Sequence, residues 1–220
     1  MRETNSIVPT QLLIDRIPAG KMIKAIIFDW GGVLIENPTP AMIKYFSDSL
    51  GVVGRAINYA GDHLVLLFQK GIISEDTLWE EVCRTLKVQK PSSPSLWYDA
   101  FTKSYKPRTK MFALASKLKS DGYRVGLLSN AETPSMKFFE EQRYDMFEAT
   151  IFSCAVGVSK PERKIYEIVL DALQVSPHEA IFIDDREDFI DSAKKIGIKT
   201  IHFISQPQVK TELRSLLKKT

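Results

Sequence analysis

The sequence lacks the features that define several other classes of protein. No apolar stretch in its 220 residues approaches the ~20 residues that a membrane-spanning helix needs. Its two cysteines, Cys83 and Cys154, lie far apart and form no CxxC pair, so we expect buried reduced thiols. Residues 1–21 have no continuous apolar region of the kind found in a secretory signal. We therefore expect a cytoplasmic protein with no membrane partner.

The net charge of the chain is also small. The formal net charge of +3 is small and dispersed, and no basic stripe is interleaved with aromatic residues, so we expect no nucleic-acid partner. With 44% hydrophobic and 26% charged residues, the composition is typical of a soluble globular protein. The length allows one well-buried core, or a core plus a small second domain. No feature of the sequence indicates the oligomeric state.

Three short apolar runs are present, and each is followed directly by polar side chains. The runs and the residues that follow them are 24–28 with Asp29, 124–128 with Ser129 and Asn130, and 180–183 with Asp184 and Asp185. Continuous apolar runs of this length predict buried parallel strands. Because ligands bind at the carboxyl ends of the strands in open α/β sheets, these polar groups could act on one ligand.

The remaining pattern predicts helices around such a sheet. Lys160 precedes Pro161, from which we predict a helix that runs to about Leu173. Residues 39–106 show helical patterns and contain no run typical of a strand. The predicted fold class is α/β, with a doubly wound, mostly parallel sheet interrupted by an all-helical insertion.

The predicted domain limits follow from these patterns. Residues 22–38 and 107–220 form the α/β core, and residues 39–106 form the helical insertion. Residues 1–21 are an N-terminal extension whose order the sequence does not indicate.

The order of these motifs along the chain resembles the haloacid dehalogenase-like hydrolase superfamily, which consists mostly of phosphatases. A strand with Asp29, a strand with Ser129, the Lys160-Pro161 pair and a strand with Asp184-Asp185 carry the resemblance, which extends from residue 22 to about 205. It implies a Rossmann-like core with a helical cap over the active site. It also implies a phosphoric monoester hydrolase that acts on a small phosphorylated metabolite, and the chain is similar to sugar-phosphate phosphatases.

The resemblance also implies roles for individual residues. Asp29 is the expected nucleophile, which forms an aspartyl phosphate. Ser129 and Asn130 are expected to donate hydrogen bonds to the phosphoryl group, and Lys160 to pair with both the phosphate and Asp29. Trp30 lies next to the nucleophile in sequence, where it could face the substrate or pack in the core.

The expected cofactor is Mg²⁺, a hard cation that prefers oxygen ligands. The resemblance implies four ligands, which are Asp29, the backbone carbonyl of Gly31, Asp185 and Asp184. Bound there, Mg²⁺ would offset the repulsion between a carboxylate nucleophile and a phosphate.

Two residues depart from the common pattern of the family. Gly31 stands where most of its phosphatases have a second aspartate, which serves as general acid and base. Its absence should slow the reaction least for leaving groups that need little protonation. Phe189 stands where many relatives have Asn or Asp. Either Asp188 substitutes for that residue or the metal has fewer direct protein ligands.

Two alternative functions remain open from the sequence. Metal-independent 2-haloacid dehalogenases also lack the second aspartate, but they resemble one another in having small polar residues in place of Asp184-Asp185. The other alternative is a catalytically weak member that binds a phosphorylated ligand or a protein partner, and Gly31 is its main support.

Overall fold

A computed structural model describes residues 22–218, and the predicted extension at residues 1–21 lies outside them. The core is a five-stranded parallel sheet with strand order β3-β2-β1-β4-β5. Its strands are β1 (Ala25–Phe28), β2 (Arg124–Ser129), β3 (Ala149–Phe152), β4 (Ala180–Asp184) and β5 (Lys199–His202). The three apolar runs of the sequence are β1, β2 and β4, which are buried throughout.

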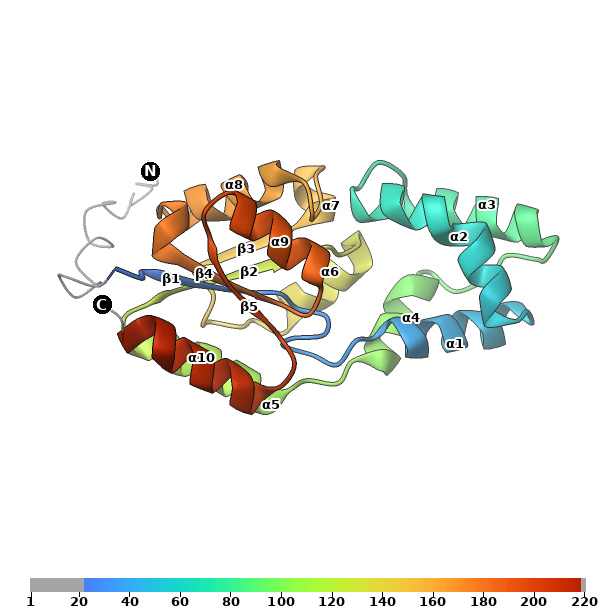
Figure 1. The fold of residues 1–220 in the computed structure, drawn as a ribbon. Helices are drawn as coiled ribbons and strands as arrows, with labels where there is room; N and C mark the ends of the chain where they lie inside the picture. Colours follow the sequence, from blue (N-terminus) through green and yellow to red (C-terminus); the bar gives the residue numbers. More distant parts are fainter. Residues whose placement is uncertain (1–21, 219–220) are drawn as a thin grey trace, which may run out of the picture.

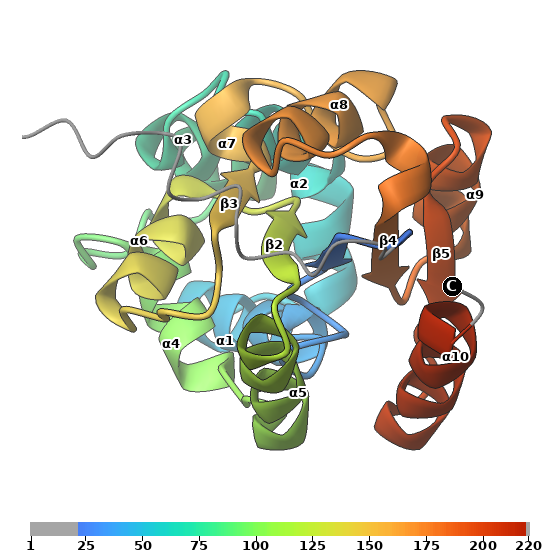
Figure 2. The ribbon, with the colours of Figure 1, turned by 90° about the vertical axis from the view of Figure 1, so that its left-hand side faces the viewer.

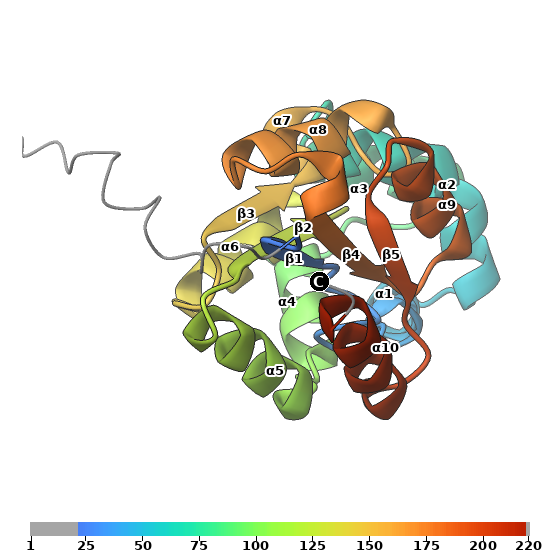
Figure 3. The ribbon, with the colours of Figure 1, turned by 60° about the vertical axis from the view of Figure 1, so that its left-hand side comes forward.

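Helices cover both faces of the sheet (Figures 1 and 2). One face packs against α5 (Thr109–Ser120) and α10 (Gln206–Lys218), and the other against α8 (Arg163–Ala172) and α9 (Glu187–Lys195). Figure 3 shows the two pairs of helices on opposite sides of the strands. Alternate residues of β1 face opposite sides, so both of its faces must be apolar.

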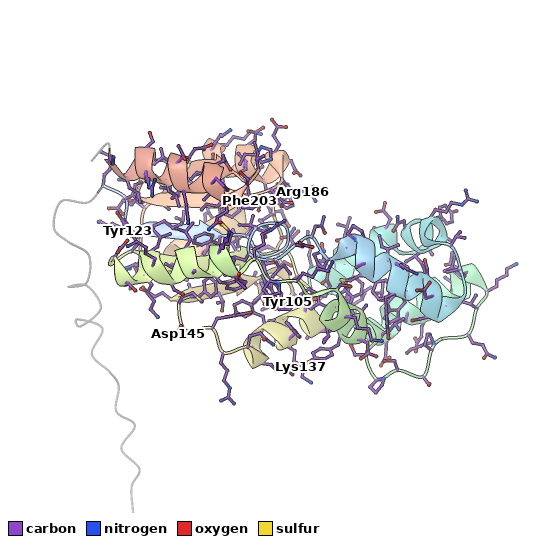
Figure 4. All side chains as sticks on the ribbon, turned by 90° about the horizontal axis from the view of Figure 1, so that it is seen from below. Tyr105, Tyr123, Lys137, Asp145, Arg186 and Phe203 are labelled. Carbon is purple, nitrogen blue, oxygen red and sulfur yellow. The ribbon has the colours of Figure 1, made fainter. Side chains whose placement is uncertain are left out.

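The chain between β1 and α5 folds into a helical cap on one side of the core (Figure 1). Its helices are α1 (Thr39–Leu50), α2 (Gly54–Gln69), α3 (Glu75–Leu86) and α4 (Leu96–Ser104). Tyr105 follows α4 where the chain returns from the cap to the core (Figure 4). The predicted fold class, a doubly wound sheet with an inserted helical cap, is confirmed. No helix within residues 22–218 has the length and apolar character to cross a bilayer.

One predicted helix start is wrong. The helix expected to begin at Pro161 begins at Arg163. The side chain of Glu162 accepts a hydrogen bond from the backbone N–H of Ser159 (2.9 Å), which holds residues 159–162 in a turn. Lys160 therefore lies in this turn, ahead of the helix, and not at a helix N-terminus.

The register of the sheet explains why the predicted polar residues meet. Phe28 of β1 pairs with Leu127 of β2 and with Ile183 of β4. Asp29, which follows Phe28, therefore emerges between the carboxyl ends of the neighbouring strands. The strand order reverses its direction at β1, and such a switch point is the usual ligand-binding position in an open α/β sheet.

Candidate active site

A pocket of about 250 Å³ lies at the carboxyl ends of β1, β2 and β4, where the cap meets the core. Core residues that line it include Asp29, Ser129, Asn130, Lys160 and Asp185. The cap contributes side chains from α1, α2 and α4, among them Met42, Gln69 and Trp97. In Figure 4, Arg186, which also lines the pocket, lies at the end of the core that faces the cap.

Lys160 links two carboxylates at the base of this pocket. Its Nζ lies 2.6 Å from Oδ1 of Asp29 and 2.7 Å from Oδ2 of Asp184, and all three side chains are at least nine-tenths buried. The same ammonium donates to the backbone carbonyl of Leu128 at 3.1 Å. Since an ammonium has three N–H donors, these contacts use its full capacity. Lys160 thus fixes the position of Asp29, and its direct pairing with a phosphate stays a prediction.

Burial and charge shift the ionisation of this group. Burial raises the pKa of Asp29 to about 7; the charge of Lys160 lowers this pKa in part, and the charge of Asp184 raises it further. Burial alone would lower the pKa of Lys160, but the charges of Asp29 and Asp184 outweigh it and raise that pKa. Burial, followed by the charge of Asp184, raises the pKa of Asp185. Lys160 therefore stays protonated, and the carboxylates repel one another.

Three carboxylates are close enough to hold one metal ion. Asp29, Asp184 and Asp185 each offer an oxygen, and these oxygens lie within 4.8 Å of one another. The two oxygens of Asp184 are already engaged, since Oδ2 accepts from Lys160 and Oδ1 accepts from the backbone N–H of Arg186 at 2.9 Å. Asp29 and Asp185 are therefore better placed than Asp184 to bind a cation directly.

The turn after Asp29 is shaped around the carboxylate of Asp185. Gly32 has φ +94°, and a Cβ at this position would lie 2.2 Å from Oδ2 of Asp185. Only glycine fits there, for conformational and for steric reasons. At Gly31, by contrast, a Cβ would meet only Cδ of Pro38, at an ordinary contact distance of 3.6 Å. The chain would accept a larger residue at position 31.

Asn130 and Ser129 lie where the sequence predicts them, at the end of β2. The side-chain amide of Asn130 makes hydrogen bonds to both backbone groups of Lys160. Its Nδ2 donates to the carbonyl of Lys160 (2.9 Å), and its Oδ1 accepts from the N–H of Lys160 (2.8 Å). Asn130 therefore holds the turn that carries Lys160. Ser129 lines the pocket and is 3% exposed. Hydrogen bonds from both residues to a phosphoryl group stay predictions.

Trp30 lines the pocket but packs as a core residue. Its ring contacts Phe101, Phe139 and Phe152, with ring centroids 5.0–6.0 Å apart. It is 2% exposed, and its Nε1 has no hydrogen-bond partner among the described residues. Contact of this indole with a substrate stays a prediction.

At the position of Phe189, the structure favours a metal with fewer direct protein ligands. Phe189 lines the pocket, and its ring lies 5.0 Å from Nζ of Lys160. Asp188 forms an exposed ion pair with Arg186 at 2.7 Å and lies outside the group of three carboxylates. Asp188 therefore does not substitute for the Asn or Asp of other family members.

Sequence reasoning missed a polar junction between the cap and the core. Glu132, which follows β2, is buried and accepts hydrogen bonds from Gln69 Nε2 (2.8 Å), Trp97 Nε1 (3.0 Å) and Ser135 Oγ (3.1 Å). Burial raises the pKa of Glu132, and these bonds offset part of the shift. Gln69 and Trp97 belong to cap helices, so Glu132 connects the cap to the core. The only local signal was its place shortly after Ser129-Asn130.

Comparisons with known proteins agree with this geometry. A sequence model of the haloacid dehalogenase-like hydrolase family matches residues 23–197. The chain is 29% identical over 197 residues to a sesquiterpene phosphatase, AstK, of Aspergillus oryzae, covering 88% of this chain and 96% of that protein. It is 36% identical over 90 residues to the glyceraldehyde 3-phosphate phosphatase of Pyrococcus furiosus, which covers 40% of this chain and 38% of that protein.

A solved structure is similar over most of the chain. It is that of a HAD family enzyme, BT-2542, from Bacteroides thetaiotaomicron, in complex with magnesium and inorganic phosphate. The TM-score is 0.71 at 26% identity, and the alignment covers 84% of this chain and 96% of that one. The shared fold, the order of the motifs and the matched family agree, and this chain therefore belongs to the haloacid dehalogenase-like hydrolases.

Proposed function

We propose that the protein is a magnesium-dependent phosphatase that hydrolyses a small phosphomonoester through Asp29. The observation that carries the proposal is the convergence of Asp29, Lys160, Asp184 and Asp185 at the switch point of the sheet. The phosphatase relatives and the neighbouring structure with magnesium and phosphate support it.

Asp29 is proposed as the nucleophile. Its Oδ1 is held by Lys160, and its second oxygen is available to attack phosphorus in line with the leaving oxygen. The new bond joins Asp29 to phosphorus, and the bond from phosphorus to the leaving oxygen breaks. Because Gly31 offers no acid, the departing alkoxide takes its proton from water. A water molecule then cleaves the aspartyl phosphate, which restores Asp29 and releases phosphate.

The residues of the site fit a divalent cation. Three carboxylates share one ammonium in a largely buried group, and oxygen ligands suit Mg²⁺. Asp29, Asp185 and the backbone carbonyl of Gly31 would hold the ion, and Asp184 would orient Lys160 beside it. When bound, Mg²⁺ supplies positive charge that offsets the repulsion between Asp29 and the phosphate.

The dehalogenase alternative fits this geometry poorly. It requires no metal, yet without a cation the three carboxylates would have only Lys160 to offset their mutual repulsion. The alternative of a catalytically weak phosphate-binding protein has one observation in its favour, which is the absence of an acid at Gly31. The test below separates it from a phosphatase.

The test is hydrolysis of p-nitrophenyl phosphate by the purified protein. We expect release of p-nitrophenol that requires Mg²⁺, stops with EDTA and is lost in Asp29→Asn. Asp191→Asn is the matched control, because Asp191 lies on α9 in an exposed ion pair with Lys194 (3.3 Å). Release that persists in EDTA or in Asp29→Asn would contradict the proposal. Phosphate binding without any release would favour the binding role.

The finer sequence-based expectations stay proposals. We retain residues 39–106 as the cap and residues 22–38 with 107–220 as the core. A cytoplasmic location and the absence of a nucleic-acid partner likewise stay predictions. The relatives named above are a sesquiterpene phosphatase and a glyceraldehyde 3-phosphate phosphatase, so their names do not distinguish between an apolar and a polar alcohol as the substrate's leaving group.

A further inference from the structure

A second cavity lies inside the cap and adjoins the active-site pocket. Its volume is about 390 Å³, compared with about 250 Å³ for the pocket around Asp29. The residues that line both spaces are Thr39, Met42, Gln69, Trp97 and Glu132. Because the two spaces share these walls, one ligand could place its phosphate at Asp29 and the rest of its structure in the cap.

The cap cavity is mainly apolar. Ten of the sixteen residues that line it have apolar side chains, so the occupant should be largely hydrocarbon. Phe46 of α1 and Leu78 and Val82 of α3 form buried parts of its wall. Asn58 and Asp62, on α2, are exposed, and the buried part of the wall is apolar except for Glu132 at the junction with the active-site pocket.

The polar junction between the two spaces already has its hydrogen-bond partners. The carboxylate of Glu132 accepts from Gln69, Trp97 and Ser135. Hydroxyl groups of a sugar in the buried part of the cap cavity, away from the exposed Asn58 and Asp62, would find few free partners, and an unpaired buried hydroxyl weakens binding. A hydrocarbon needs no such partners, so the wall favours an apolar group.

We propose that the cap cavity binds the hydrocarbon part of the substrate, which is a phosphate monoester of an apolar alcohol with up to about fifteen carbons. An apolar cavity of about 150 Å³ can hold benzene, which has six carbons, and 390 Å³ scales to about fifteen. This assignment rests on the proposed phosphatase function.

The first test compares ethyl, butyl, octyl and dodecyl phosphate as substrates below their micelle-forming concentrations. We expect kcat/KM to rise about fourfold for each added methylene, the ratio that corresponds to ~0.8 kcal/mol per buried CH₂, until the cavity is full. Hydrolysis of all four substrates with equal kcat/KM would overturn the assignment of the cavity.

A cavity-filling variant locates the effect in the cap. Gly61 lies in α2 and lines the cavity, and a Cβ there would lie 3.7 Å from Cγ2 of Val65 and 3.9 Å from Cγ2 of Val82. Gly61→Leu should therefore project into the space between these walls. We expect it to lower the ratio of kcat/KM for dodecyl over ethyl phosphate at least tenfold.

The matched control is Tyr59→Leu, which places the same side chain on the same helix at a position that is 84% exposed. We expect it to keep the wild-type ratio. A folded Gly61→Leu protein, verified by circular dichroism, that also keeps the wild-type ratio would contradict the proposal.

A binding measurement makes the test independent of turnover and of the variant. Trp79 and Trp97 line the cavity, so 12-bromododecylphosphonate should quench tryptophan fluorescence more strongly than 2-bromoethylphosphonate. Strong quenching without hydrolysis of any phosphate would refute the phosphatase proposal and support the cavity assignment. Hydrolysis of p-nitrophenyl phosphate with equal quenching by both phosphonates would refute the cavity assignment alone.

Discussion

Introducing an acid at position 31 tests whether Gly31 limits the rate. Gly31 lines the pocket close to Asp29, and a Cβ there would meet only Cδ of Pro38, at 3.6 Å. Its φ lies outside the left-handed region, so the Cβ that Gly31→Asp adds should cause neither a clash nor backbone strain. The neighbouring carboxylates should raise the pKa of the new aspartate, which would favour its acid form.

The expected gain depends on the leaving group. General acid catalysis contributes ~10²–10⁴-fold, or about 3–5 kcal/mol at 1.36 kcal/mol per decade. An alkoxide needs a proton in order to leave, whereas p-nitrophenolate does not. We therefore expect Gly31→Asp to raise kcat on alkyl phosphates by ~10²-fold or more and to change kcat on p-nitrophenyl phosphate by less than about tenfold.

The assay is steady-state kinetics on both substrates at saturating Mg²⁺, with Gly31→Asn as the control. Asparagine has nearly the size of aspartate but has no carboxyl proton to donate. Equal rates for Gly31→Asp and Gly31→Asn, or an equal gain on both substrates, would refute the view that a missing acid limits turnover.

Three further predictions concern the same site. Because the pKa of Asp29 is raised to about 7, protons should compete with Mg²⁺ for this carboxylate at lower pH. Calorimetry should show that the affinity for Mg²⁺ falls up to tenfold per pH unit below about pH 7. Lys160→Met leaves Asp29 and Asp184 without their ammonium partner, so the free energy of unfolding should fall by ~3–5 kcal/mol, and Mg²⁺ should partly restore it. Urea unfolding at neutral pH measures this change, and an unchanged midpoint would contradict the prediction. Trp30→Phe removes an unpaired buried N–H, so the free energy of unfolding should change by less than about 1 kcal/mol. A raised KM in this variant would show that the substrate accepts a hydrogen bond from Nε1 of Trp30.

The central part of the site could be predicted because strand ends are local signals. A buried parallel strand is a continuous apolar run, and the residue that follows it lies at the ligand-binding edge of the sheet. Asp29, Ser129 and Asp184 follow such runs, and the register between β1, β2 and β4 brings them together. The helix predicted to begin at Pro161 begins two residues later, because the side chain of Glu162 stabilises a turn before it.

The parts that depend on docking of the cap could not be predicted. Gln69, Trp97 and Glu132 come from three separate segments, and no periodicity of the sequence places them together. Trp30 illustrates the same limit, since its sequence position next to Asp29 does not show that three phenylalanines surround its ring. Likewise, the alternation of apolar residues in α1, α2 and α3 predicts a packed cap and not the cavity between these helices.

The contacts of Lys160 lead us to expect that phosphatase activity depends strictly on a divalent metal ion. Its three donors are committed to Asp29, Asp184 and the carbonyl of Leu128, so pairing with an incoming phosphate would require one of these contacts to break. A phosphate dianion would meet a buried group in which three carboxylates share one ammonium, and the repulsion would be strong in a buried site. In the proposed mechanism Lys160 would orient Asp29, and positive charge for the phosphate would come mainly from a cation at Asp29 and Asp185. A protein that kept most of its phosphatase activity without a divalent cation would require Lys160 to leave Asp184.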